Sequence, residues 1–476
     1  MKQNSNPSAM GVILIYILFG IALLFLFDGT YSEDETALFI ELMASYIWTA
    51  GLLIYAKLFF RLYIFEPLFF IGVLYELIFV VKPLIDLKNH NMVEHGINVF
   101  AGGEKATALF TLGFTILFLA YYGGHAKENT KMVLPNDEEK EDETPEGKSL
   151  ILYIAWFVVY GLCLISMFSQ GLSLKYIFSL GSGGERITDS DNVALLFLTN
   201  FGITLITLWL MIIVKTKNMA IKMLITLLCI VYLLMRNARW LVLVFIASPI
   251  VYYYVKRRKS PSWLLVLAAG LAGLTIFAWM QANRTILNTG GGIQGWGKDG
   301  FSMELLIAPF ESDLNTYRTF YSMVTRYPSR YEYIFGKSFL YTLVLFIPRV
   351  IWPGKPDNPS KEIIEHSLNV RAKMSGTAVA NIGEFYVNFG ILGICIGMFI
   401  LGRAAVMIKR RFLSSSAEVR DNHKTKDNFL MYAILYPLWF QWIARGNFSG
   451  NFYMTIFAML PFICQSCWKA LMRRRK

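Results

Sequence analysis

The sequence predicts an all-α, polytopic membrane protein with about twelve transmembrane helices, from its composition, its hydropathy pattern and the placement of its positive charges. Hydrophobic residues make up 55% of the 476 residues, and the mean hydropathy is +0.47, far above that of an ordinary soluble domain. A soluble globular protein is therefore excluded. The net charge of +12 is explained by basic loops, so we expect no nucleic-acid partner.

The apolar runs set the positions of the predicted helices. A helix needs about 20 apolar residues at a rise of 1.5 Å per residue to cross roughly 30 Å of hydrocarbon. The predicted spans lie near residues 10–27, 38–56, 62–81, 105–122, 149–168, 193–214, 219–235, 240–255, 262–280, 384–402, 428–444 and 452–470. No small-residue processing site follows the first run, so we expect no cleaved signal peptide.

The positive charges assign the two sides of the membrane, because short loops rich in lysine and arginine stay in the cytoplasm. The basic clusters are residues 57–61, 215–222, 256–259, 409–411 and 473–476. An internal N-terminus places all of them, and the C-terminus, on the inside. The acidic segment 28–36 and the long segment 281–383 then fall on the outside.

This topology divides the chain into three parts. Residues 1–280 hold the first nine spans and a cytoplasmic loop at 123–148, most of which is charged and expected to be disordered. Residues 281–383 form an extracytoplasmic domain with short amphipathic or re-entrant helices, because their apolar runs are too short or interrupted to span. Residues 384–476 hold the last three spans.

Arginines predicted at the outer face are the first candidates for ligand binding. Arg236 and Arg239 occupy the outer turn of a tight helical hairpin, where the positive-inside bias works against them. Either they snorkel to the surface or cap the preceding helix, or they point into a cavity and hold an anion. Arg445 repeats the arrangement at another outer hairpin. With Arg349 in the long segment, these residues suggest one shared anionic ligand.

Carboxylates that could transfer a proton at the same face are Glu311 and Asp313 in the long segment and Glu384 at the start of a span. A carboxylate within an apolar segment is expensive and by default functional, although a helix N-terminus would also stabilise its charge. His366 lies in a polar loop, where we expect it to be solvated. The five histidines are scattered, so we expect neither a metal site nor a cofactor.

Residues 325–402 carry a motif around Arg349 and a second motif around Glu384. The first is a Pro-Arg-x-x-Trp-Pro-x-Lys-Pro run, and the second is Glu-x-Tyr before Asn-Phe-Gly-x-x-Gly. The matching residues are Pro348, Arg349, Trp352, Pro353, Lys355, Pro356, Glu384, Tyr386, Asn388, Phe389, Gly390 and Gly393. This combination resembles the oligosaccharide repeat-unit polymerases of bacterial envelopes, the Wzy-type O-antigen and capsule polymerases. The turn around Arg239 is also similar to one on which these polymerases carry a pyrophosphate-binding arginine.

The resemblance implies a GT-C-like integral-membrane transferase in the bacterial cytoplasmic membrane, working by inverting, metal-independent glycosyl transfer on its outer face. The growing chain on undecaprenyl pyrophosphate would be the donor, and a sugar hydroxyl of a new lipid-linked repeat unit the acceptor. A flippase and a chain-length regulator are the partners expected in such a pathway. An O-antigen ligase-like transferase and a non-catalytic transporter of lipid-linked oligosaccharides remain the alternatives.

The resemblance also implies a role for each candidate residue. The departing pyrophosphate would be held by a cage of cations in a partly dry cavity. Its members would be Arg239, Arg349 and Arg445, together with Arg236, Arg318 and Lys355. Trp352 and Tyr386 would stack on sugars. Glu384, or Asp313 as the second choice, would accept the proton of the acceptor hydroxyl.

Overall fold

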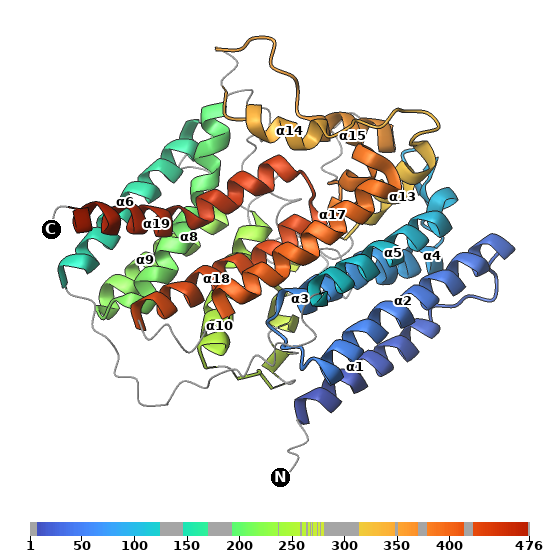
Figure 1. Cartoon of the computed structure of the whole chain (residues 1–476), viewed down its shortest axis with the longest axis horizontal. Coiled ribbons are helices and arrows are strands. Elements are labelled where there is room, and N and C mark those ends of the chain that lie inside the picture. Colours follow the sequence, from blue (N-terminus) through green and yellow to red (C-terminus); the bar gives the residue numbers. More distant parts are fainter. Residues whose placement is uncertain are drawn as a thin grey trace.

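The protein is predominantly helical in the computed structural model, with its helices arranged side by side (Figure 1). The structure describes residues 7–123, 146–169, 193–236, 238–257, 259–262, 314–347, 351–369, 378–413 and 422–474, together with parts of 265–279. The predicted disordered loop lies almost entirely outside these residues.

The elements of the N-terminal half are mostly long apolar helices. They are α1 (Pro7–Leu24), α2 (Glu33–Phe59), α3 (Pro67–Glu76), the π-helix η1 (Leu77–Val81), α4 (Lys82–Lys88), β1 (Val93–Glu94), β2 (Ile97–Asn98), the 3₁₀-helix η2 (Val99–Gly102), α5 (Gly103–Tyr122), α6 (Glu146–Ser169), α8 (Val193–Lys215), α9 (Met219–Arg236) and α10 (Arg239–Arg257). The strands β1 and β2 form a short antiparallel hairpin between α4 and η2.

Among the described residues of the C-terminal half, three short helices precede three long ones. They are α13 (Thr316–Arg326), α14 (Lys337–Val344), α15 (Pro359–Leu368), α17 (Asn381–Leu413), α18 (Asn422–Ala444) and α19 (Phe448–Arg474). The short helices α13, α14 and α15 lie together along one end of the helical bundle, at the top of Figure 1. They belong to the segment that the sequence places outside the membrane.

Helices occupy the positions of all the predicted spans except 262–280, which the structure describes only in part. Within the described residues, six helical segments are long and apolar enough to cross a membrane: Glu33–Phe59, Pro67–Lys88, Val99–Tyr122, Leu150–Phe168, Arg239–Arg257 and Asn381–Leu413. The all-helical class and the presence of several candidate membrane spans are thereby confirmed. The number of twelve spans, the long outer loop and the GT-C-like architecture stay predictions.

Buried apolar side chains form two large clusters. The first joins α2, α3, α5, α13, α15 and α17, and the second joins α6, α8, α9, α10 and α19. Helix α18 contributes to both, because Leu430 and Tyr432 pack in the second cluster whereas Trp439 and Ile443 pack in the first. In Figure 1, α17 and α18 accordingly run between the two groups of helices.

The short helix α13 packs closely against η2 and the first cluster. A Cβ atom on Gly102 would lie 2.8 Å from the backbone oxygen of Tyr321, so no larger residue fits without moving the α13 backbone. The hydroxyl groups of Thr107 and Tyr321 lie 3.0 Å apart and hydrogen-bond between α5 and α13. The short outer helices are therefore held by the packed core beneath them.

Candidate functional site

The start of α17 is the point where α14, α19 and the hairpin between α18 and α19 meet, and Glu384 joins two of these elements. Its carboxylate accepts the backbone N–H of Phe448 at 3.0 and 3.3 Å, and the Ser338 hydroxyl also donates to it. The first N–H groups of a helix lack partners within that helix and favour a negative charge. Glu384, which is only 3% exposed, therefore caps the N-terminus of α19 from a neighbouring helix.

The hairpin between α18 and α19 is fixed by its own backbone as well. Gly446 has a φ of +51°, and a Cβ atom there would lie 2.0 Å from the backbone oxygen of Val379, just before α17. The Asn451 side chain donates to the backbone oxygens of Gln441 and Gly446. Arg445, which is half-buried, thus lies on a turn whose position relative to α17 is determined on both sides.

Asn388 docks the segment before α14 onto a break in α17. Its side-chain oxygen accepts the Gly336 N–H at 2.9 Å, and its amide group donates to the Ser338 hydroxyl at 2.8 Å and to the Glu384 backbone oxygen at 2.7 Å. The helical backbone is interrupted at Phe389 and at Gly390, whose φ is +62°. The Asn-Phe-Gly part of the motif therefore forms a polar joint in the N-terminal part of a long apolar helix.

Tyr386, from the same motif, is buried in this joint. Its hydroxyl donates to the backbone oxygen of Tyr327 at 3.0 Å, and its ring makes an edge contact with Tyr333. With only 1% of its surface exposed, it offers no ring face on which a sugar could stack in this conformation. Trp352 is 40% exposed and does offer such a surface.

Helix α14 is attached to α19 by a second set of hydroxyl groups. Ser449 donates to the backbone oxygen of Ser338 at 3.0 Å, and the hydroxyls of Thr342 and Ser449 lie 2.9 Å apart. Tyr453 donates to the backbone oxygen of Thr342 at 2.8 Å. These hydrogen bonds fix α14 to the N-terminal part of α19.

Arg239 and Arg445 lie toward the same end of a packed pair of helices. Helices α10 and α18 pack together, and Asp427 near the start of α18 is within electrostatic reach of Tyr252 near the end of α10, so the two run antiparallel. At 1.5 Å per residue, Arg239 lies about 20 Å and Arg445 about 27 Å along their helices from that contact. Arg236, at the end of α9, is half-buried and lies near Tyr232.

The comparison with protein families decides the identity. The model of the O-antigen polysaccharide polymerase Wzy family matches residues 10–471. The chain belongs to this family. No curated protein and no solved structure gives a significant match. Membership in the Wzy family confirms the resemblance seen at 325–402, extends it over nearly the whole chain, and supports an O-antigen repeat-unit polymerase in a membrane.

Arg318 has partners that differ from those expected for a ligand-binding residue of this Wzy protein. Its guanidinium donates to Asp86 at 2.9 and 3.3 Å and to the backbone oxygen of Asn91 at 2.7 Å, and it lies 3.5 Å from Glu94. Burial alone would lower the pKa of Arg318, but Tyr317 and Asp86 raise it above its ordinary value. The side chain therefore fastens α13 to α4 and to the β-hairpin.

Lys355 is also directed inward, although it belongs to the family-like motif. It is 4% exposed, and its ammonium group donates to the backbone oxygens of Leu345 and Ile347 at 2.7 and 3.0 Å. It thereby holds the turn that leads into Pro348. Arg349 and Asp313 lie outside the residues that the structure describes.

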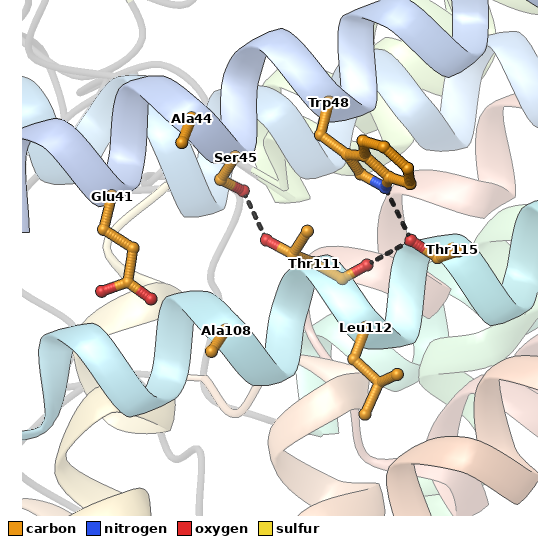
Figure 2. Close-up of a pocket in the computed structure, with 8 residues that line it drawn as sticks. All are labelled: Glu41, Ala44, Ser45, Trp48, Ala108, Thr111, Leu112 and Thr115. Carbon is orange, nitrogen blue, oxygen red and sulfur yellow. Dashed lines mark hydrogen bonds between the residues drawn. The ribbon is translucent and has the colours of Figure 1, made fainter.

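A groove between α2 and α5 lies apart from these residues, with a cavity volume of about 430 Å³ (Figure 2). It is lined by Glu41, Ala44, Ser45, Trp48, Ala108, Thr111, Leu112 and Thr115. Across it the hydroxyls of Ser45 and Thr111 lie 2.7 Å apart, and the Trp48 indole donates to Thr115 at 2.9 Å. Such bonds satisfy polar groups between membrane helices, so the groove is a helix-packing feature.

Sequence reasoning missed Asp86, Ser338 and Phe448 as parts of this region. An aspartate four residues after a lysine, directly after the apolar span predicted at 62–81, was a signal that a buried cation partner exists. Ser338 gives no such signal, and Phe448 takes part through its backbone, which the side-chain type does not reveal.

Proposed function

We propose that this Wzy-family chain joins undecaprenyl-pyrophosphate-linked oligosaccharide repeat units into O-antigen, capsule or exopolysaccharide, by inverting and metal-independent glycosyl transfer on the outer face of the bacterial cytoplasmic membrane. The growing chain is the donor, and a sugar hydroxyl of a new lipid-linked unit attacks its anomeric carbon. The bond to the pyrophosphate oxygen breaks as the new glycosidic bond forms, and the hydroxyl proton passes to a base.

The observation that carries this proposal is the fixed position of the Arg445 hairpin. Gly446 packs against the backbone of Val379, and Glu384 binds the backbone N–H of Phe448 on the other side of the turn. A cation held in place before the reaction stabilises developing charge without having to reorganise. The leaving pyrophosphate gains negative charge in the transition state, so a fixed arginine at the outer face suits this chemistry.

Arg239 and Arg349 complete the proposed cage, with Arg236 beside them. The antiparallel packing of α10 and α18 supports placing Arg239 and Arg445 on one ligand, since both lie toward the same end of that pair. Arginine suits the task because its planar fork can bind two phosphate oxygens at once. The inward contacts of Arg318 and Lys355 favour supporting roles for these two residues.

We assign Glu384 to positioning and Asp313 to proton transfer. A general base must come within hydrogen-bond reach of the acceptor hydroxyl, directly or through one water molecule. The carboxylate of Glu384 is almost fully buried and already accepts bonds from Phe448 and Ser338. This favours a role in holding the arginine-bearing hairpin, and it leaves Asp313 as the proposed acceptor of the proton.

The test is chain growth by purified protein in lipid vesicles, with synthetic lipid-linked repeat units and EDTA in the buffer. Wild-type protein should make polymer, Arg445→Ala should lose at least roughly 100-fold in rate, and Arg445→Lys should recover part of it. Lys337→Gln, which removes an exposed cation from α14, is the matched control and should behave as wild type.

Three results would count against the proposal. Activity that requires a divalent metal would exclude the arginine cage as the main source of charge stabilisation. Normal polymer lengths from Arg445→Ala would remove that residue from the site. Transfer of a finished polymer to another lipid, without chain growth, would identify a ligase.

A further inference from the structure

A cluster of aromatic and basic side chains lies at the end of α13, in the turn that follows it and on α15, and the mechanism proposed above does not use it. Its members are Arg326, Tyr327, Arg330, Tyr331 and His366, here called the His366 cluster. The rings of Tyr331 and His366 stack at 3.9 Å with an interplanar angle of 4°. The hydroxyl of Tyr327 lies 3.1 Å from Nδ1 of the same imidazole.

The two arginines are attached to this ring stack. Arg326 donates to the backbone oxygen of His366 at 2.7 Å, and the guanidinium of Arg330 lies 5.6 Å from the ring centre of Tyr331. Arg326, Tyr331 and His366 are half-buried and Arg330 is exposed, so a ligand can reach the cluster from the protein surface. The five side chains form one connected cluster, because each member contacts at least one other.

Among the described residues, the two arginines of the cluster form no ion pair, although the Glu362 carboxylate acts electrostatically on Tyr327. Burial and the neighbouring charge of Arg330 lower the pKa of Arg326. Over the residues that the structure describes, no carboxylate lies within ion-pair distance of Arg326 or Arg330. Arg318 on the same helix, by contrast, is paired with Asp86 and Glu94. Two close guanidinium groups without a counter-ion favour the binding of an anion.

The aromatic surface beside these charges favours an anionic ligand that also has a ring, rather than a simple inorganic anion. A stacked pair of half-buried rings presents a partly exposed aromatic surface, and the arginines next to it supply hydrogen-bond donors. A free anion would use only the donors. A sugar that carries an acidic group would use both, with its ring against the patch and its acid on the arginines.

The His366 cluster is also connected to the polar joint of α17. Tyr386 donates to the backbone oxygen of Tyr327, whose hydroxyl contacts His366. The joint includes Glu384, which holds the Arg445 hairpin. The cluster and the proposed pyrophosphate site are therefore attached to one packed unit at the same end of the molecule.

We propose that the His366 cluster binds an acidic sugar of the repeat unit, one that carries a carboxylate or a phosphate substituent. The acidic group is held by Arg326 and Arg330, and the sugar ring packs against Tyr331 and His366. This inference rests on the proposed function, because it assigns a subsite to the saccharide of the same reaction. It makes the enzyme selective for repeat units with an acidic residue near the reacting end.

The test measures binding rather than turnover. Purified full-length protein in lipid nanodiscs is titrated with sodium glucuronate, with its neutral methyl ester and with inorganic pyrophosphate, and saturation-transfer NMR or calorimetry reports binding. Glucuronate should bind more tightly than the ester. Arg330→Gln should weaken glucuronate binding by roughly tenfold or more, the loss expected for a charge-assisted contact. Arg330→Lys should weaken it less, and Lys337→Gln should not change it.

The titration with pyrophosphate shows whether the anion bound by the His366 cluster is the acidic group of a sugar or the pyrophosphate of the lipid carrier. Its binding should be unchanged in Arg330→Gln and weakened in Arg445→Gln. If Arg330→Gln weakens pyrophosphate binding instead, the cluster belongs to the lipid pyrophosphate site and the acidic-sugar subsite is wrong. Equal binding of glucuronate and its ester, or an equal loss in Lys337→Gln, would also overturn it. Chain growth on the same preparations reports separately on the proposed function.

Discussion

The substitution Glu384→Gln tests whether Glu384 positions the Arg445 hairpin or acts as the general base. The carboxylate accepts the Phe448 N–H with both oxygens, and the Ser338 hydroxyl donates to it as well. Glutamine keeps one oxygen but turns an NH₂ group toward a backbone donor. Losing one or two hydrogen bonds to a charged group, each worth about 1.5 to 3 kcal/mol, should destabilise the hairpin by roughly 2 to 4 kcal/mol.

The assay compares thermal unfolding with chain growth in the same detergent preparation. We expect the unfolding midpoint of Glu384→Gln to fall and chain growth to fall with it, because Arg445 is no longer held. Glu362→Gln is the matched control, since Glu362 is an exposed carboxylate on α15. An unchanged unfolding midpoint with a loss of roughly 100-fold or more in rate would refute this reasoning and return Glu384 to the role of general base.

The remaining predictions concern folding and topology. Arg318→Gln should destabilise the protein by about 3 to 5 kcal/mol, because it removes one of the two cations that pair with the buried Asp86, and in denaturation experiments Asp86→Asn should cost at least as much, because it takes the carboxylate from both Lys82 and Arg318. Gly446→Ala should lower the unfolding temperature and chain growth together, since its Cβ atom would meet a backbone oxygen at 2.0 Å; wild-type behaviour would contradict the tight packing of the hairpin. A cysteine at Ser360 should react with an impermeant thiol reagent on intact cells and one at Thr144 should not, and the reverse pattern would invert the topology.

The helices could be predicted from the sequence because their signal is local. An apolar run of sufficient length identifies a helix without knowledge of its neighbours, as α2, α5 and α17 illustrate. The membrane class followed directly from such runs. The number of spans is harder to predict, since length and hydropathy alone do not separate a buried helix from one that crosses the bilayer.

The roles of single residues were harder to predict, because their partners are distant or belong to the backbone. Glu384 binds a backbone N–H 64 positions later, and Arg318 binds a carboxylate 232 positions earlier. The sequence marks Glu384 as a costly charge in an apolar segment and Arg318 as one of the cations of the long segment, but it does not show which groups bind either of them. Tyr386 looked like a sugar-stacking residue by type, yet its hydroxyl supports the turn at Tyr327.

Under the proposed function, the contribution of α18 to both buried clusters would limit how a lipid-linked substrate enters the site. A lateral opening between the two buried clusters would have to separate α18 from one of them. Leu430 and Tyr432, near the start of α18, pack in the second cluster, whereas Trp439 and Ile443, near its end, pack in the first. The outer end of that helix leads directly into the hairpin with Arg445. The movement of α18 that admits the lipid tail would then also displace Arg445. The enzyme would reach the arrangement needed for glycosyl transfer only after α18 had packed again.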